Sequence, residues 1–240
     1  MLRAGEELRA ARRWAIFLLL PLAACAGRDY RPVADSPVRI GKPYSIRGQT
    51  YAPVADPAYD ELGYASWYGP ESGSQTANGE RFRPDWVTAA HKTLPLPTYV
   101  EVTALDSGRT ILVRVNDRGP FARGRLIDLS RGAAELLGIR GQGHAAVRVR
   151  RVEPPERDRE RLREGDAARE RARATPLVLA NLRAQLDAGI RAGLVEAPWT
   201  VALETGWLSC SVTLAKAGVQ LPFAYPQRRS WIPAFAGMTI

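Results

Sequence analysis

The chain has 240 residues, of which 45% are hydrophobic, so it can hold one packed domain of ordinary size plus tails but leaves little room for two large domains. Its formal net charge of +9 favours anionic partners such as acidic polymers or lipid head groups. Nucleic acid would be the first expectation for a basic cytosolic chain, but the N-terminus argues against it because it carries an export signal.

Residues 1–24 have the layout of a secretory signal peptide. Arg12 and Arg13 precede an apolar run over 14–20, which is too short to span a bilayer and is followed by small residues. The sequence LAAC at 22–25 resembles the bacterial lipobox and predicts that Cys25 is acylated, with palmitate among its acyl groups, and becomes the new N-terminus. The alternative is an ordinary signal peptide with an incidental cysteine. Ala26, in place of Asp, resembles the sorting signal for the outer membrane.

Residues 25–60 contain many Pro, Asp, Arg and Tyr residues without helical or strand periodicity. We expect this segment to be a lipidated tether that lifts the following domain off the membrane.

Residues 61–153 consist of short strand-like runs separated by Gly, Pro, Asn and Asp. A helix is predicted over 130–137, with Ser130 as its N-cap and Gly138 as its C-terminal stop. The pattern indicates a mainly β domain, a small barrel or sandwich, with one short inserted helix. The six predicted strands are 63–68, 87–91, 98–104, 110–116, 125–129 and 145–152.

Residues 154–198 form a charged, helical extension. Residues 153–174 alternate Arg with Glu or Asp, as a solvated helix or a stiffened linker does. Leu182, Leu186, Ile190 and Leu194 recur every four residues and predict a second helix whose apolar stripe packs on the barrel or on a partner. Periodicity is lost over 199–240, and the end of this stretch resembles translated intergenic repeats, so we expect a disordered tail.

Polar side chains that could act as an acid and a base lie where the predicted strands begin or end. Glu80, His91 and Asp117 are such a set, and loops held by a rigid barrel are where catalytic groups are commonly displayed. Each also has a structural explanation: Asp117 as a turn residue, Glu80 as a solvated residue after a hairpin turn, and His91 as a buried, hydrogen-bonded histidine. The cysteines and histidines are too few and too dispersed for a zinc site, so we expect no metal and no cofactor.

Five ordered motifs carry a resemblance to a known family. They are ASWYG at 65–69, TANGE at 76–80, TAAHKTLP at 88–95, VRVNDRGP at 113–120 and IDLS at 127–130. Together they resemble the rare lipoprotein A (RlpA) family over about residues 39–152. The resemblance implies a six-stranded double-psi β-barrel and a septal peptidoglycan lytic transglycosylase that prefers glycan strands stripped of stem peptides. By motif match, the family's site residues fall on Glu80, His91 and Asp117.

The implied reaction is a lyase reaction that breaks the β-1,4 bond between MurNAc and GlcNAc and leaves a 1,6-anhydro-MurNAc end. Asp117 is the expected acid, which protonates the leaving oxygen and then acts as base when the sugar's own C6 hydroxyl attacks. Glu80 would assist or stabilise positive charge, and His91 would hydrogen-bond a carboxylate. Arg118 is a substrate contact or a structural contact. Substrate contacts are assigned to Tyr68, Thr76, Asn78 and Arg118.

Two departures from the family pattern keep an alternative open. Residues 70–75 replace the usual segment, and no C-terminal peptidoglycan-binding SPOR domain is recognisable after 153. Both favour a non-catalytic wall-binding lipoprotein. A hydrolase of another polysaccharide would need a second carboxylate to activate water, for which Glu80 is available. The expected partners are peptidoglycan glycan strands, the membrane through the N-terminal lipid, and cell-division proteins, at the periplasmic side of the outer membrane.

Overall fold

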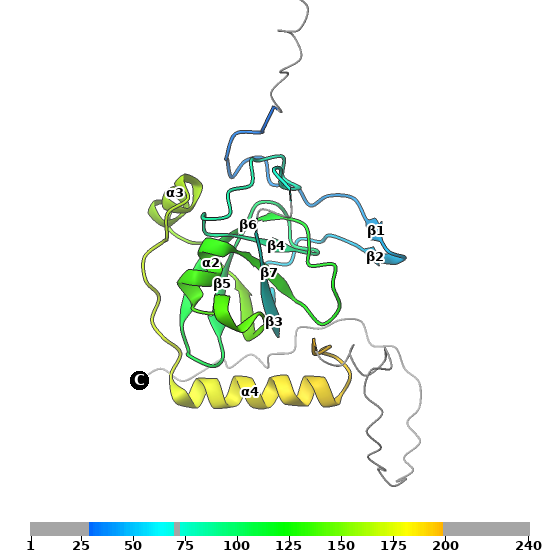
Figure 1. Ribbon diagram of the computed structural model, residues 1–240, viewed down its shortest axis with the longest axis vertical. Helices are drawn as coiled ribbons and strands as arrows, with labels where there is room; N and C mark the ends of the chain where they lie inside the picture. Colours follow the sequence, from blue (N-terminus) through cyan, green and yellow to red (C-terminus); the bar gives the residue numbers. More distant parts are fainter. Residues whose placement is uncertain (1–28, 70–72, 199–240) are drawn as a thin grey trace, which may run out of the picture. The chain divides into compact units, whose positions relative to one another are not determined.

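The barrel is built from six strands, and the computed structural model describes residues 29–69 and 73–198 (Figure 1). The strands are β3 (Asp60–Tyr68), β4 (Thr88–His91), β5 (Thr98–Ala104), β6 (Thr110–Asp117), β7 (Ile127–Ser130) and β8 (Ala145–Arg151). They close in the order β3, β7, β4, β6, β5, β8. The pairs β3–β7 and β4–β6 are parallel and the other pairs are antiparallel. The predicted fold, a mainly β double-psi barrel with one inserted helix, is confirmed.

All six predicted strands are present, with small differences at their ends. β3 begins earlier than the alternation predicts and β7 begins later, whereas β5 has the predicted bounds. Strand ends are the least well defined part of such a prediction because the hydrophobic pattern is set by the buried centre of each strand.

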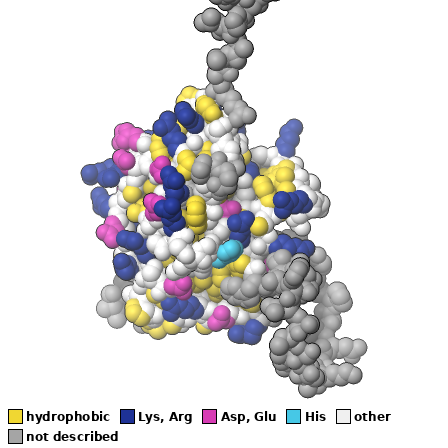
Figure 2. Space-filling view, in the orientation of Figure 1, with side chains coloured by type: hydrophobic (Ala, Val, Ile, Leu, Met, Phe, Trp, Pro, Cys, Tyr) yellow, Lys and Arg dark blue, Asp and Glu magenta, His cyan; other side chains and the backbone are white. Residues whose placement is uncertain are grey.

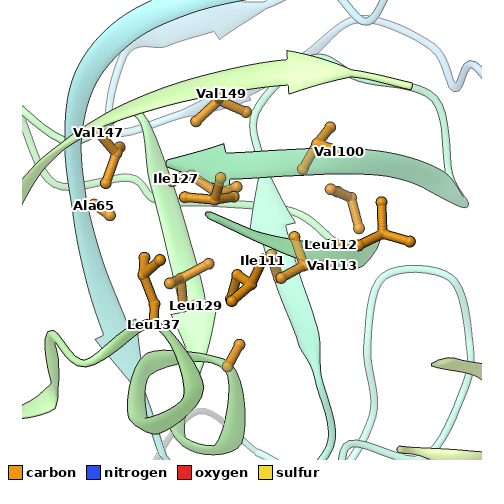
Figure 3. Close-up of a cluster of buried hydrophobic side chains, with 14 of the residues drawn as sticks. Ala65, Val100, Ile111, Leu112, Val113, Ile127, Leu129, Leu137, Val147 and Val149 are labelled. Atoms are coloured by element: carbon orange, nitrogen blue, oxygen red, sulfur yellow. The ribbon is translucent and has the colours of Figure 1, made fainter. Parts of the chain in front are cut away.

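Aliphatic side chains from every strand fill the barrel interior. Val100, Ile127 and Val149 have no exposed surface, and they gather in the space enclosed by β5, β7 and β8 (Figure 3). β-Branched side chains suit the pleated strand, and full burial of each such side chain contributes about 1.5–3 kcal/mol to stability. The core is therefore sufficient to hold the wall rigid, which fixes the side chains at the strand ends.

Helix α2 (Arg131–Leu137) follows β7 directly, with the caps that the sequence predicts. The Ser130 side chain accepts from the Ala133 amide, and Gly138 ends the helix in the left-handed conformation. Ala133, Ala134 and Leu137 are buried against the barrel, where Leu137 lies beside Leu129 (Figure 3). The helix covers one part of the barrel, where it contacts β3, β4, β6 and β7.

The extension after the barrel is helical in part. The charged run forms α3 (Glu156–Glu164), and the apolar stripe lies on α4 (Pro176–Arg191), which packs against β3 (Figure 1). Leu182 and Leu186 are buried as predicted, together with Tyr64 and Leu105 of the barrel. Leu194, in contrast, is exposed because the helix ends at Arg191.

Residues 31–59, which the sequence predicts to belong to a tether and approach segment, have more regular structure than their lack of periodicity indicates. They contain a hairpin, β1 (Tyr44–Ile46) and β2 (Gln49–Tyr51), and their backbone is bonded to the barrel. Arg39 and Leu96 exchange two amide-to-carbonyl bonds of 2.8 Å, and the Arg31 amide donates to the Gly79 carbonyl at 2.7 Å. The segment is ordered without any periodic pattern because a chain rich in turn residues can satisfy its backbone hydrogen-bonding groups on a neighbouring loop.

The signal peptide, Cys25, the replaced residues 70–72 and the tail over 199–240 lie outside the described residues. Within the described ranges, no helix has the length and apolar character needed to cross a membrane.

Candidate active site

Glu80 closes a tight turn over 76–80 and is nearly completely buried, with 1% of its surface exposed. Its carboxylate accepts four hydrogen bonds. Asn78 and one Arg114 nitrogen donate to Oε1 at 2.8 and 2.9 Å, and Asn116 and the other Arg114 nitrogen donate to Oε2 at 2.8 and 2.7 Å. A carboxylate offers about four acceptor positions. Glu80 is therefore fully occupied by the protein itself.

The Arg114 guanidinium connects Glu80 to the segment that precedes the barrel. It donates to the Ala34 carbonyl at 2.7 Å and lies 3.3 Å from Asp35 Oδ1. Asp35 also accepts from Tyr99 at 2.8 Å and from Arg163 of α3 at 2.6 Å. Partial burial of Asp35 acts to raise its pKa, but the bonds from Tyr99 and Arg163 outweigh it and hold the pKa below the ordinary 3.8.

His91 ends β4 as a buried, neutral imidazole. Its Nδ1 accepts from the amides of Thr93 and Leu94 at 3.2 and 3.1 Å, so the proton lies on Nε2, which donates to Tyr59 Oη at 2.8 Å. Burial, followed by the charges of Lys92 and Arg118, lowers the pKa of His91 to about 3. The partner of His91 is thus a tyrosine hydroxyl in place of the expected carboxylate.

Asp117 lies at the carboxyl end of β6 and is only partly buried. Its Oδ1 accepts from the Ala77 amide at 2.7 Å and from the Arg118 amide at 2.8 Å, while Oδ2 has no hydrogen-bond partner among the described residues. Burial raises the pKa of this carboxyl above 3.8, against the two amides and the Arg118 charge, which lower it. Asp117 is therefore a carboxyl group that the described part of the chain holds through one oxygen.

Asp128 of β7 is a second such carboxyl group, which the sequence interpretation did not single out. Ser66 of β3 donates to its Oδ1, and Arg125 lies 3.4 Å from the same oxygen. Its Oδ2, like that of Asp117, has no hydrogen-bond partner in the described part of the chain. Burial raises the pKa of Asp128 above 3.8, and Ser66, Arg125, Lys92 and His144 oppose the rise. The sequence signal was weak, since the alternation over 127–130 assigns Asp128 to the polar face of its strand.

The strand register places Asp117 and Asp128 on either side of Ala90. Ala90 of β4 is the partner of Asp117 on the parallel strand β6 and of Asp128 on the antiparallel strand β7. Burial, followed by the charges of both carboxyl groups, raises the pKa of the Tyr68 hydroxyl well above 10. Tyr68 stacks on Phe82 with ring centroids 4.9 Å apart, and Ala90 packs in the same small cluster. The two carboxyl groups therefore flank one apolar patch.

The other residues predicted to contact substrate have structural partners. Thr76 Oγ1 accepts from the Glu80 amide at 3.2 Å, and Asn78 joins Glu80 to Arg31. Tyr68 is buried apart from 7% of its surface, which leaves little of its ring for a sugar. The Arg118 guanidinium donates to the carbonyls of Leu94, His91 and Ile40 at 2.6, 3.3 and 3.0 Å, so of its two predicted roles the structure shows the structural one.

Backbone contacts connect the Glu80 and His91 environments to Asp117. The Asn78 amide donates to the Asn116 carbonyl at 3.1 Å, which holds the turn over 76–80, and with it the Ala77 amide, against the end of β6. On the other side, the turn after His91 supplies the Leu94 carbonyl that binds Arg118, the neighbour of Asp117. Among the described residues no cluster of acidic, histidine and cysteine side chains is suited to a metal ion.

Comparison with known proteins places this geometry in a family. Residues 60–149 match the model of a double-psi β-barrel family described as lytic transglycolase. A curated relative from Rickettsia felis, named endolytic peptidoglycan transglycosylase RlpA, is 47% identical over 115 residues. The barrel is an RlpA-family domain. The resemblance of its five motifs to that family is thereby confirmed.

Other RlpA proteins match the same part of the chain. The relative from Pseudomonas aeruginosa is 54% identical over 114 residues and that from Vibrio cholerae is 50% identical over 110 residues, and both carry the same name. These matches cover 47% and 45% of this chain, and 33% and 42% of the relatives. The Rickettsia match covers 46% of this chain and 50% of that relative. The chain thus spans between a third and a half of the RlpA relatives it matches.

Among solved structures, the Streptomyces papain inhibitor aligns with a TM-score of 0.36 and 23% sequence identity, over 42% of this chain and 100% of that chain.

Proposed function

We propose that this RlpA-family barrel is a peptidoglycan lytic transglycosylase that cleaves the β-1,4 bond between MurNAc and GlcNAc and leaves 1,6-anhydro-MurNAc ends. The observation that carries the proposal is the Asp117 carboxyl group, held through one oxygen by two amides while the other has no hydrogen-bond partner among the described residues. Its raised pKa favours the protonated form that an acid catalyst requires. The names of the RlpA relatives supply the reaction class.

The chemistry needs little beyond a proton at the leaving oxygen. Asp117 Oδ2 donates a proton to O4 of GlcNAc as the bond from C1 of MurNAc to O4 breaks, and positive charge develops at C1. The C6 hydroxyl of the same MurNAc then forms the bond from O6 to C1, and its proton passes to a carboxylate base. For this base the sequence predicts Asp117 itself.

Glu80 and His91 support this reaction as positioning residues. Glu80 has no acceptor position left for substrate, but it fixes the turn that brings the Ala77 amide to Asp117. His91 is neutral and buried, and it fixes the turn whose Leu94 carbonyl binds Arg118. Both residues therefore act through the atoms that hold Asp117, and neither needs to touch the glycan.

The charge of the protein supports peptide-poor glycan strands as substrate. Where stem peptides are removed, every second sugar of the strand bears a free lactyl carboxylate, so the strand is a polyanion. The chain has a net charge of +9, of which the expected signal peptide contributes only +2 through four Arg and two Glu, and Lys and Arg side chains are spread over the face drawn in Figure 2. Electrostatic attraction of this kind raises the rate of encounter with an anionic polymer.

Mass spectrometry of reaction products tests the function directly. The chain from Ala26 to Ile240 is incubated with peptide-stripped glycan strands, beside the variants Asp117→Asn and Asp106→Asn. In Asp117→Asn the side-chain amide oxygen can still accept from both backbone amides, but the group cannot donate the proton. Anhydro ends are therefore expected from the wild type and from the exposed control Asp106→Asn only. Absence of products from all three chains, with binding to the strands retained, would support the alternative of a non-catalytic wall-binding lipoprotein.

The cellular location is a separate part of the proposal. The lipobox-like sequence at 22–25 supports lipidation of Cys25 by palmitate and related chains, and Ala26 supports sorting to the outer membrane, facing the periplasm. Labelling cells with a clickable fatty acid tests this. Cys25→Ala should abolish labelling, and unchanged labelling would refute the anchor.

A further inference from the structure

A second carboxyl group lies two strands away from the proposed acid, on the same apolar patch. Asp117 and Asp128 are both register partners of Ala90, on opposite sides of β4. Neighbouring strands are about 4.8 Å apart, so the two Cα atoms are separated by roughly 9.6 Å. Between them is the Ala90 methyl group, the smallest side chain that still covers the sheet. As register partners of the same residue, the two carboxyl groups lie on the same side of the sheet with one small side chain between them.

The two carboxyl groups are held in the same manner. In each, Oδ1 is fixed, by the Ala77 and Arg118 amides for Asp117 and by the Ser66 hydroxyl for Asp128. In each, Oδ2 has no hydrogen-bond partner among the described residues. Asp128 remains accessible, since 12% of its side chain is exposed. Glu80, by contrast, uses both of its oxygens in hydrogen bonds within the protein and has none left for a substrate.

The surroundings of the two groups differ in charge. Asp128 faces Arg125 at 3.4 Å and is also within the field of Lys92 and His144, whereas Oδ1 of Asp117 is bonded to neutral amides. The Arg118 guanidinium acts on Asp117 only from a distance, because its own bonds are to carbonyl groups. Burial raises the pKa of both carboxyl groups, but among the described residues only Asp128 of the two has an ion-pair partner, and a nearby cation favours the ionised form that a base needs.

We propose that Asp128 is the second catalytic carboxylate of this site, the base that takes the proton from the MurNAc C6 hydroxyl. The inference rests on the proposed transglycosylase function. Asp117 gives its proton to O4 as the bond between C1 and O4 breaks, and O6 bonds to C1 as its proton passes to Asp128. The electron pair of the broken bond stays on O4. After release of both products, proton exchange with water returns Asp117 to its acid form and Asp128 to its carboxylate form.

Ser66 and Arg125 position this base. Arg125 Nη1 donates to Ser66 Oγ, and the Ser66 hydroxyl donates to Asp128 Oδ1, so the three side chains form one chain of hydrogen bonds. Ser66 and Asp128 are also register partners on the parallel strands β3 and β7. Replacement of Ser66 therefore changes the surroundings of the proposed base while the carboxyl group itself stays in place.

The test uses the chain from Ala26 to Ile240 and peptide-stripped strands. It compares the pH dependence of turnover for the wild type, Asp128→Asn, Ser66→Ala and the exposed control Asp106→Asn. We expect Asp128→Asn to lower kcat at least 100-fold with KM within about threefold, which is the range for loss of a general base. Ser66→Ala should lower kcat several-fold and move the acidic limb of the profile to higher pH, because it removes a hydrogen bond to the carboxylate. Asp106→Asn should match the wild type.

Each outcome decides a separate question. A wild type that yields no anhydro ends refutes the transglycosylase, whereas reducing MurNAc ends would show that the site activates water and is a hydrolase. An active wild type whose kcat and pH profile are unchanged by Asp128→Asn overturns the assignment of Asp128 alone. If Asp128→Asn unfolds, Ser66→Ala decides, since an unmoved acidic limb and an unchanged kcat in that variant would equally overturn the assignment.

Discussion

Arg114 and Glu80 form an ion pair of 2.7 Å in which each side chain has only 1% of its surface exposed. Removal of one member of a buried pair leaves the other charged and without compensation, which typically costs about 3–5 kcal/mol. Glu80→Gln should therefore lower the free energy of unfolding by about 3 kcal/mol, measured by urea denaturation. The control is Glu135→Gln, whose pair with Arg140 is about half exposed, and which should change stability little. A Glu80→Gln protein of normal stability but without turnover would instead indicate direct participation of Glu80 in catalysis.

The stability of the protein should depend on pH through His91. Its pKa is about 3 in the folded state against an ordinary value of 6.5, so between these values the unfolded chain binds a proton that the folded chain does not. The stability that neutral His91 provides is complete above pH 6.5 and falls as the pH is lowered, by up to about 1.4 kcal/mol per pH unit.

His91→Asn isolates this effect, because an asparagine oxygen can still accept from the amides of Thr93 and Leu94 but does not titrate. The wild type should lose stability relative to the variant between pH 6.5 and 4, measured by chemical denaturation at several pH values. A constant difference between the two proteins over that range would contradict the buried neutral imidazole.

The basic limb of the activity profile should belong to Asp117. Catalysis requires its protonated form, and burial raises its pKa above 3.8, so kcat/KM should decrease as the pH rises through a value higher than 3.8. Measurement of initial rates from pH 3.5 to 8 locates this limb. A profile that is flat over the range in the wild type would exclude a carboxylic acid as the proton donor.

Asp35 should hold the segment before the barrel, residues 31–59, against Arg114 and Arg163. Asp35→Asn weakens the contacts to Arg114 and Arg163, and we expect a loss of about 1–2 kcal/mol because the site is partly exposed. The pKa of Asp35 is below 3.8, so this contribution is present above pH 3.8 and is lost as the pH falls through the lower folded value. Limited proteolysis should cleave residues 31–59 faster in the variant, whereas Asp187→Asn on the exposed face of α4 should be cleaved as the wild type is.

The packing of α4 can be tested with two leucines of the same helix. Leu186 has 4% of its surface exposed, whereas Leu177 has 73%. Leu186→Ala should cost about 2–3 kcal/mol of unfolding free energy, and Leu177→Ala should cost almost nothing. Equal effects of the two substitutions, measured by thermal unfolding, would show that the helix does not dock on the barrel in solution.

Much of the fold was predictable because its signals are local. The strands follow alternation of apolar residues, and the helix after β7 is bounded by Ser130 and Gly138, both of which cap it as expected. The hairpin of β1 and β2 was missed for an equally local reason. Its two turn residues, Arg47 and Gly48, both have positive φ, and Arg at the first position lacks the Asn or Asp that normally indicates such a turn.

The site was predictable only in part, because the arrangement of its side chains depends on how strands that are distant in the sequence pair with one another. Glu80, His91 and Asp117 stand at recognisable strand ends, but the sequence does not show that Glu80 is saturated by Arg114 or that His91 is bonded to Tyr59. Asp128 lies inside a strand, where an alternating pattern assigns it to a solvated face. Only the closure of β4 between β6 and β7 brings it level with Asp117.

The bond between the Arg31 amide and the Gly79 carbonyl limits how far the domain can move from its proposed anchor. Only six peptide links separate Arg31 from Cys25, the proposed lipid attachment, and so short a chain reaches at most about 20 Å. A glycan strand would then have to come close to the membrane to be cut, because the domain cannot travel outward to meet it.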